Sequence, residues 1–373
     1  MIFTPENSVV ARDWIVEQMK KKASFFIRGA GSRLPPAHLL PKTGLCTEKL
    51  NKVKFFHPED MVISVEAGMR FEQMSRILAR ENMCLPVSPW YPEATIGGMI
   101  AANDFGPERM MGGGARDHII GIEYINGSGH LVKAGGRVVK NVTGYDLSRM
   151  MIGSMGGLGL ITTVNFRVLP QPANPRMLTI ETSDTRWVAG LEKLHLQHVP
   201  LDLVQATCRS GTWKVSFGIS GKEARQERLI DELGAVFGKE IENSVGQYQP
   251  YQAIFNTDID EARTKQHLHG CFSIKTLLNA PRLEALAQMG ERLICHPISG
   301  DFHLFESAEK GPLITHAKAL FQDSEGYLVQ VVIAEKNNEP VIYPKPGEWG
   351  LIKKLQEMSD PAGVFKPDFG QLC

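Results

Sequence analysis

Apolar residues at helical spacing predict two amphipathic helices in the first eighty residues. The first helix begins near Asn7 and Ser8, and its apolar face comprises Ala11, Trp14, Ile15 and Met19. The second helix has an apolar face of Phe71, Met74, Ile77 and Leu78.

Alternating apolar and polar residues predict strands over residues 61–67 and 162–168, and the short apolar run within residues 24–28 predicts another strand that leads into the turn Gly29-Ala30-Gly31-Ser32. A hairpin is expected where residues 119–125 and 131–134 flank the turn Asn126-Gly127-Ser128-Gly129. Pro170 and Pro172 end the last of these strands, because proline cannot donate to a ladder. We place a domain boundary at this proline-rich segment.

Beyond the boundary the pattern changes to strands and helices in a different order. Strands are expected over residues 177–182, 204–208, 213–219, 271–278 and 328–334, and helices over 185–196, 222–237, 281–293 and 349–358. This order predicts an antiparallel sheet with helices on one face. We therefore divide the chain into residues 1–172, residues 176–338 as a smaller α+β cap domain, and residues 339–373 as a C-terminal helix and tail.

Composition excludes several classes of protein. The 373 residues carry 41 Lys+Arg and 41 Asp+Glu, so no basic surplus suggests a nucleic-acid partner. The start of the chain lacks the pattern of a signal peptide, and no run is long and apolar enough to span a bilayer. None of the six cysteines forms a C-x-x-C pair, which argues against a zinc or iron–sulfur site. We expect a cytoplasmic protein, associated with membranes only through partners.

Glycine clusters between residues 92 and 162 carry the strongest chemical signal. They are Gly97-Gly98, Gly112-Gly113-Gly114, Gly135-Gly136, Gly156-Gly157 and Gly159. Glycine admits positive φ and lets a ligand approach the backbone, and successive main-chain N–H groups bind anions. Several such turns in series predict a site for a dinucleotide. No G-x-G-x-x-G opens an early helix, so a Rossmann site is not expected.

The ordered motifs resemble those of FAD-linked oxidases of the vanillyl-alcohol-oxidase (PCMH) type, and among these the FAD-binding E subunits of bacterial glycolate oxidase complexes. The motifs that carry the resemblance are Arg28-Gly29-Ala30-Gly31-Ser32, Thr95-Ile96-Gly97-Gly98, the block Lys140 to Arg149, Gly153 to Thr162, and the tail Asp360 to Pro367. The resemblance implies an α+β fold with a two-part PCMH-type FAD-binding domain. It covers the first 170 residues and the tail, and is weak in between.

The resemblance also implies which residues bind the cofactor. The first turn would hold the FAD pyrophosphate, and the later segments would line the flavin. The full set is Arg28, Gly29, Ala30, Gly31, Ser32, Thr95, Ile96, Gly97, Gly98, Ala102, Asn103, Asp117, Lys140, Asn141, Gly157, Gly159, Ile161 and Thr162. Relatives with covalent flavin carry a histidine in the first turn, where this chain has Ala30-Gly31, so FAD is expected to be non-covalent.

The implied function is oxidation of a small 2-hydroxy acid, with hydride transfer to flavin and electrons passed to a partner. The implied partners are a second FAD-linked oxidase subunit and an iron–sulfur subunit. The catalytic subunit of such complexes carries a late Glu-His-Gly motif that this chain lacks, so no catalytic residue is assigned. A non-catalytic FAD-binding, electron-relay or assembly subunit stays open, as does a stand-alone reductase of the same fold.

Histidines in the second domain raise two weaker possibilities. His267, His269 and Cys271 would share one face of a strand, but three groups without a fourth ligand do not define a metal site, and we expect none. His303 lies beside Asp301, and we expect this pair in a surface loop rather than in an acid–base role.

Overall fold

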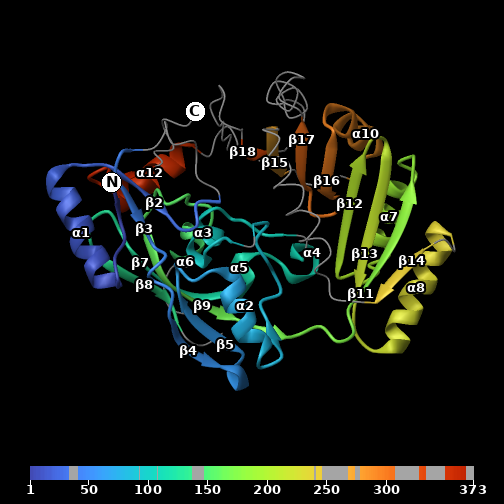
Figure 1. Ribbon diagram of the computed structural model, residues 1–373, viewed down its shortest axis with the longest axis horizontal. Helices are drawn as coiled ribbons and strands as arrows, with labels where there is room; N and C mark the ends of the chain where they lie inside the picture. Colours follow the sequence, from blue (N-terminus) through green and yellow to red (C-terminus); the bar gives the residue numbers. More distant parts are fainter. Residues whose placement is uncertain are drawn as a thin grey trace. The chain divides into compact units, whose positions relative to one another are not determined.

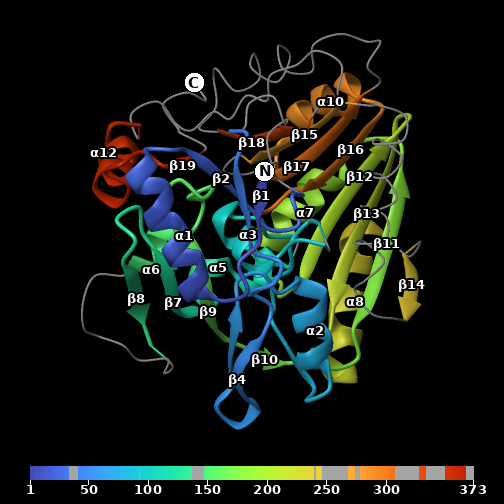
Figure 2. The same ribbon diagram turned by 60° about the vertical axis from the view of Figure 1, so that its left-hand side comes forward.

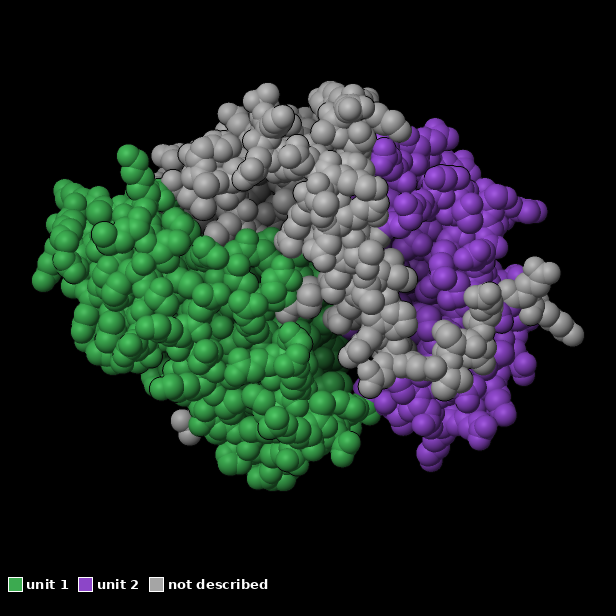
Figure 3. Space-filling view, viewed as in Figure 1, with its two compact units in different colours: residues 1–106, 113–171, 346–373 green, residues 107–112, 172–345 purple. Residues whose placement is uncertain are grey.

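The computed structural model describes residues 1–32, 41–91, 93–106, 108–136, 147–238, 241–245, 268–273, 278–306, 327–332 and 349–366. The chain forms two compact units (Figure 3). Unit 1 comprises Met1–Gly106, Gly113–Gln171 and Pro346–Cys373, and unit 2 comprises Pro107–Gly112 and Pro172–Lys345. The division after Gln171 lies in the proline-rich segment, and the C-terminal helix belongs to unit 1.

A parallel sheet of four short strands forms the first part of unit 1. Its order is β1 (Ile2–Phe3), β3 (Gly44–Cys46), β2 (Phe25–Arg28) and β19 (Phe365–Lys366). Helix α1 (Ser8–Lys21) lies beside this sheet (Figure 1) and buries Ala11 and Ile15 in one cluster with Phe25. The Asn7 side chain caps α1 by accepting from Val10 N at 3.0 Å. The helix predicted at the start of the chain is confirmed.

An antiparallel five-stranded sheet forms the second part of unit 1. Its order is β4 (Val53–His57), β5 (Val62–Glu66), β9 (Leu160–Arg167), β7 (Ile119–Ile125) and β8 (Leu131–Gly135). The hairpin and the two central strands follow their predicted ranges. Strand β4 was not predicted, because it lies at the sheet edge with Val53 36% exposed and shows no apolar alternation.

Short helices cover the antiparallel sheet and share its core. These helices are α2 (Phe71–Ala79), α3 (Ile96–Ala101), α5 (Ala115–His118) and α6 (Leu147–Met151). Unit 1 also contains the 3-10 turn η2 (Pro58–Asp60), which buries none of its residues, and the ribbon of β6 (Met83–Cys84) with β10 (Leu169–Pro170). Helix α12 (Trp349–Ser359) is tied to this unit by the Ser359 hydroxyl, which donates to Leu158 O at 2.5 Å.

Unit 2 contains an eight-stranded, fully antiparallel sheet, which Figure 2 shows with its strands side by side. Its order is β14 (Glu242–Val245), β11 (Arg176–Thr182), β13 (Thr212–Ile219), β12 (Leu203–Arg209), β16 (Arg292–His296), β17 (Asp301–Glu306), β15 (Leu268–Ser273) and β18 (Tyr327–Val332). Helices α7 (Trp187–Leu196), α8 (Glu223–Phe237) and α10 (Ala280–Met289) pack their apolar residues on the sheet's apolar side chains. Helix α4 (Arg109–Gly112) also contacts β12. The predicted α+β class with an antiparallel sheet is confirmed.

Two expectations for unit 2 are wrong. The helix expected over 281–293 ends at Met289, and residues 292–296 form β16, because Gly290 interrupts the helix and an Arg-Leu-Ile-Cys-His run follows. His303 and Asp301 are in β17 and not in a surface loop, and they are 0% and 6% exposed. His267 lies outside the described residues, so the expectation about His267, His269 and Cys271 stays a prediction.

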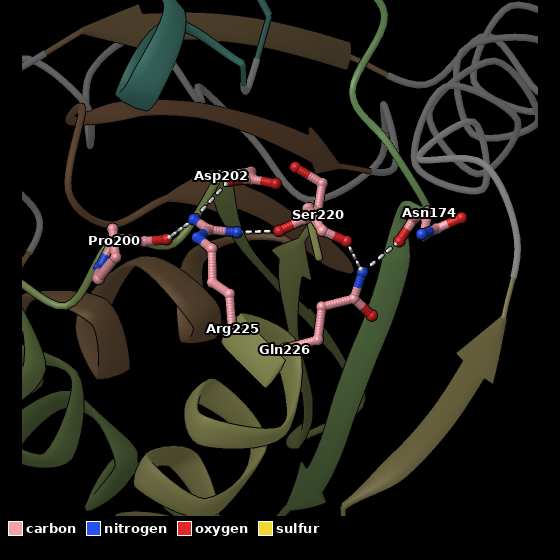
Figure 4. Close-up of polar contacts among 7 residues, drawn as sticks. Asn174, Pro200, Asp202, Ser220, Arg225 and Gln226 are labelled. Carbon is pink, nitrogen blue, oxygen red and sulfur yellow. Dashed lines mark hydrogen bonds and ion pairs between the residues drawn. The ribbon is translucent and has the colours of Figure 1, made fainter. Parts of the chain in front are cut away.

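Helix α8 anchors the segment that leads into unit 2 (Figure 4). The Gln226 amide donates to Asn174 O at 2.7 Å and to Gly221 O at 2.9 Å. The Arg225 guanidinium donates to the carbonyls of Ser220 and Pro200 and pairs with Asp202. Because Gln226 is only 1% exposed, these bonds replace solvent for carbonyl groups where unit 2 begins.

Candidate functional site

A pocket in unit 1 collects most of the glycine motifs. Its walls come from the turn after β2, from the segment that begins α3, and from the loop that leads into β9. The described lining residues are Ile27, Gly29, Ala30, Gly31, Ser32, Thr47, Ala67, Ala94, Thr95, Gly97, Gly98, Ala101, Ala102, Asp104, Met155, Gly156, Gly159, Leu160 and Ile161.

The first wall is the turn Gly29–Ser32. Gly31 has φ +86°, a conformation that glycine adopts without strain. In the described part of the chain, no backbone carbonyl accepts from the N–H groups of Gly29, Ala30 and Gly31. These donors can therefore serve an anionic ligand, as a backbone anion nest does.

Gly29 is required for a different reason. Its φ is not positive, but a Cβ atom there would lie 2.0 Å from the Thr95 hydroxyl oxygen and 3.0 Å from Thr95 Cγ2. The turn and the start of α3 therefore touch at this point. A glycine is needed because the two segments approach so closely.

The second wall is the start of α3, where Thr95 is the N-cap residue. Its hydroxyl accepts from Gly98 N at 3.2 Å, while Ile96 N and Gly97 N donate to Met69 O at 2.8 Å and Ala67 O at 2.7 Å. These N–H groups already have acceptors within the protein. A Cβ on Gly97 would lie 2.9 Å from Ala67 Cβ, so glycine is needed there for close packing. A Cβ on Gly98 would have Thr95 as its only close neighbour among the described residues.

The third wall runs from Met155 to Ile161. Met155 N donates to Ala101 O at 2.8 Å, and Gly153 N donates to Ile100 O at 3.0 Å, so this loop is fixed to the end of α3. Met155, Gly156 and Gly159 have φ of 47°, 79° and 152°. Left-handed backbone at several positions lets the loop present main chain to the pocket.

The structure brings together many of the residues expected to bind the cofactor. Those that line the pocket are Gly29, Ala30, Gly31, Ser32, Thr95, Gly97, Gly98, Ala102, Gly159 and Ile161. Those that do not line it are Arg28, Ile96, Asn103, Asp117, Gly157 and Thr162. Lys140 and Asn141 lie outside the described residues, as does most of the block from Lys140 to Arg149.

The predicted residues outside the lining have structural contacts of their own. Ile96 is fully buried in the core of unit 1. The Asp117 carboxylate accepts from Gly114 N at 2.8 Å and so caps α5. The Thr162 hydroxyl donates to Glu123 O at 3.0 Å. Arg28 is half-buried at the end of β2, and its Nε has no hydrogen-bond partner among the described residues.

Sequence analysis missed several lining residues, of which Asp104 is chemically the most distinctive. Others are Ile27, Thr47, Ala67, Ala94, Met155 and Gly156, whereas Ala101 and Leu160 lie in segments that were expected to line the flavin. Asp104 is 2% exposed and is the one ionisable side chain among the described lining residues. Its signal in the sequence was the Asn103-Asp104 pair, since asparagine commonly ends helices in the left-handed conformation.

The described lining suits a large, partly anionic ligand held by main chain, hydroxyl groups and small apolar side chains. It includes the hydroxyls of Ser32, Thr47 and Thr95 but no histidine, cysteine or tyrosine. A lining of this kind can bind and orient a dinucleotide. The described part of the pocket lining contains no side chain that commonly forms a covalent bond with flavin.

In unit 2, a buried polar row crosses three strands of the sheet. His296 of β16 lies opposite Asp301 of β17, and its Nε2 lies 3.4 Å from Gln205 Oε1 of β12. Burial lowers the pKa of His296 to about 3, so its imidazole is neutral at physiological pH. Arg109 of α4 lies 3.8 Å from the Asp301 carboxylate.

One group of potential metal ligands lies elsewhere on unit 1. Among the described residues, His57, Glu59 and Asp60 alone bring three ligand atoms of this type within 4.8 Å of one another. All three are exposed, and such acidic turns are common without an ion. The expectation that the protein holds no metal stays a prediction. Within the described residues, no helix is long and apolar enough to cross a membrane.

Sequence comparison finds similar proteins for part of the chain. Residues 2–135 match the family described as "FAD binding domain". Glycolate oxidase subunit GlcE of Escherichia coli is 36% identical over 148 residues, which are 39% of this chain and 42% of that protein. D-lactate dehydrogenase of Archaeoglobus fulgidus is 29% identical over 182 residues, which are 48% of this chain and 41% of that protein. The matched segments span less than half of these relatives.

Structural comparison extends the similarity to nearly the whole chain. A solved structure of alkyldihydroxyacetonephosphate synthase superposes with a TM-score of 0.74 over 97% of this chain and 75% of that chain. The two sequences are 12% identical, so the likeness shows the fold alone. The expected α+β fold with a PCMH-type FAD-binding domain is thereby confirmed.

Proposed function

We propose that this chain is an FAD-dependent oxidoreductase subunit that takes part in oxidising a small 2-hydroxy acid of the glycolate or D-lactate type. The observation that carries the proposal is the pocket formed by the Gly29–Ser32 turn, the Thr95–Gly98 segment and the loop into β9. The first two of these segments fall in the region that matches the FAD binding domain. The relatives' names supply the class of substrate.

Bound FAD would supply a hydride acceptor for the substrate carbon that carries the hydroxyl group. The chain's own part is to bind and orient this group. The N–H groups of the first turn would hold the pyrophosphate, and Arg28 could add charge at the end of β2. The lack of a covalent-attachment side chain in the described lining supports non-covalent binding.

We propose that the chain works in a complex with a second FAD-linked subunit and an iron–sulfur subunit in the cytoplasm. The relative in Escherichia coli is named as a subunit, and this chain has no C-x-x-C motif for a cluster of its own. No catalytic base is assigned. The absence of a histidine from the described lining favours, as the second candidate, a subunit whose flavin relays electrons or stabilises the complex.

Purification of the chain alone tests the cofactor. The protein should be yellow, and heat denaturation should release all FAD into the supernatant. Flavin that stays on the polypeptide would contradict non-covalent binding, and a colourless protein that FAD cannot reconstitute would contradict the whole proposal.

Anaerobic titration with glycolate and D-lactate separates the two candidates. Bleaching of the flavin in the isolated chain would show that it oxidises the substrate itself. If bleaching occurs only after co-expression with both partner subunits, the relay function is supported. If neither preparation bleaches, 2-hydroxy acids are the wrong class of substrate.

A further inference from the structure

Two arginines lie directly opposite each other on neighbouring strands of unit 2. Arg209 ends β12 and Arg292 begins β16, and the two are register partners in the antiparallel ladder. Side chains in such a pair have Cβ atoms about 4.5–5.5 Å apart, and like charges directly opposite each other are destabilising. Stability alone would therefore favour an acidic or neutral residue at one of the two positions.

The pair points away from the helices of unit 2. Cys208 and Leu293, which neighbour these arginines along their strands, belong to the core cluster that contains the apolar residues of α7, α8 and α10. Because side chains alternate across a strand, Arg209 and Arg292 point to the opposite face of the sheet. On that face Arg209 is exposed and Arg292 is half-buried.

Positive charge is in excess at this end of the sheet. Within the described residues, the Arg209 side chain makes no hydrogen bond and no ion pair. Arg292 has a further interaction within the chain, yet burial and the charge of Arg209 together hold the pKa of its guanidinium below the ordinary value. In the next register row of the same face, Lys214 has its own acidic neighbour, Glu181, at 3.9 Å.

The end of the hairpin formed by β12 and β13 makes Arg209 accessible. Ser210, Gly211 and Thr212, which follow Arg209, are all exposed. Ser210 and Gly211 turn the chain with φ of 50° and 80°, and a Cβ on Gly211 would have no described atom within 4 Å. Another protein chain can therefore approach Arg209 without displacing any described part of unit 2.

We infer that Arg209 and Arg292 bind an acidic side chain of a partner subunit, an inference that rests on the proposed complex. A guanidinium can donate two parallel N–H groups to a carboxylate, and a carboxylate between two arginines replaces their repulsion with two attractive contacts. Arginine is also enriched in protein interfaces. A small free acid is a poorer ligand, because an exposed ion pair contributes little in water, whereas a partner protein that covers the pair excludes that water.

The test compares Arg209→Gln with Arg228→Gln, a matched control on α8 of unit 2. Arg228 pairs with Glu232 at 3.4 Å, so an acidic group already compensates its charge. In the isolated full chain, R209Q should raise the melting temperature of unit 2 by about 1–4 °C, because it removes a like-charge contact. R228Q should give no such rise.

The second measurement is the affinity of each purified variant for the partner subunits, obtained by titration. R209Q should bind them at least about tenfold more weakly than the wild-type chain, because the partner's carboxylate loses one of its two donors. R228Q should bind them as the wild-type chain does. A variant that is more stable alone and weaker in the complex is the expected result for a residue kept for binding.

Other outcomes overturn the inference. An unchanged or lower melting temperature of R209Q would show that the two arginines do not repel each other. If wild-type chain forms the complex and R209Q binds as tightly, the pair lies outside the interface, and the inference fails while the proposed complex stands. If citrate stabilises the wild-type chain more than R209Q, relative to sodium chloride of equal ionic strength, a small anion is the ligand instead. If the wild-type chain binds no partner subunit, the proposed complex fails and the inference fails with it.

Discussion

Substitution of Gly29 by alanine should destabilise unit 1 and empty the pocket by displacing one residue, Thr95. The new Cβ would lie 2.0, 3.0 and 3.1 Å from Thr95 Oγ1, Cγ2 and Cβ. Rotation about χ1 cannot relieve all three contacts. Thr95 is 1% exposed and caps α3, so it must shift together with the start of the helix.

The loss in the free energy of unfolding can be assembled from three effects, of which two destabilise and one stabilises. Loss of an N-cap hydroxyl costs about 1 kcal/mol, and overpacking of a buried site costs about 1–3 kcal/mol. Replacement of glycine by alanine returns about 0.4–1 kcal/mol through the unfolded chain. The net loss in the free energy of unfolding of unit 1, summed from these effects, should therefore be about 1–3.5 kcal/mol. FAD affinity should fall at least tenfold, because Gly29 and Thr95 both line the pocket.

A double-mutant cycle isolates the cause. Thr95→Ala alone should cost about 1 kcal/mol through the lost cap. In that background the two closest atoms are gone, so Gly29→Ala should cost less than about 1 kcal/mol, well below the sum of the single effects. The measurements are scanning calorimetry of the apo protein and FAD titration by fluorescence.

The matched control is Gly114→Ala. Gly114 has φ −110°, which alanine adopts readily, and a Cβ there would have no described atom within 4 Å. Its free energy of unfolding should change by less than about 0.5 kcal/mol. A Gly29→Ala variant as mild as this control, or one that loses as much free energy of unfolding in the Thr95→Ala background as in the wild-type protein, would show that the contact with Thr95 is not the cause.

Three further predictions address other parts of the chain. Gly97→Val should abolish FAD binding, because a Cβ at this position would lie 2.9 Å from Ala67 Cβ. The calorimetric transition of unit 2 should stay unchanged, and a normal flavin content of the variant would contradict the prediction. Gln226→Leu should lower the free energy of unfolding of unit 2 by about 2 kcal/mol, since the carbonyls of Asn174 and Gly221 lose their donor. An unchanged midpoint of urea unfolding would show that Gln226 does not anchor this segment. His296 has a folded pKa of about 3 against 6.5 when unfolded, so the unfolded state binds more protons and stability falls as pH drops below about 6.5. Between about pH 7.5 and about pH 5 the loss should be about 2 kcal/mol, and His296→Gln should remove it; equal pH dependence of the two proteins would contradict the burial argument.

Local patterns of apolar residues were enough to predict the elements whose side chains face two different environments. Helix α1, the hairpin of β7 and β8, and strand β9 follow their predicted ranges. In α1 and in the second half of β9, one face is more deeply buried than the other, and apolar residues recur there at the period of the element. Strand β16 and buried His303 of β17 escaped prediction. A polar residue buried on a sheet face has the same local pattern as an exposed one.

The site divides in the same way. The glycine motifs indicated a dinucleotide pocket, because glycine clusters are a local property of the chain. The reason why particular glycines are needed came from the folded packing: Gly29 is needed because Thr95 lies against it, and Gly97 because Ala67 does. Asp104 enters the pocket through the Schellman motif that ends α3. Such contacts join residues far apart in sequence, and their distances depend on packing that no local pattern records.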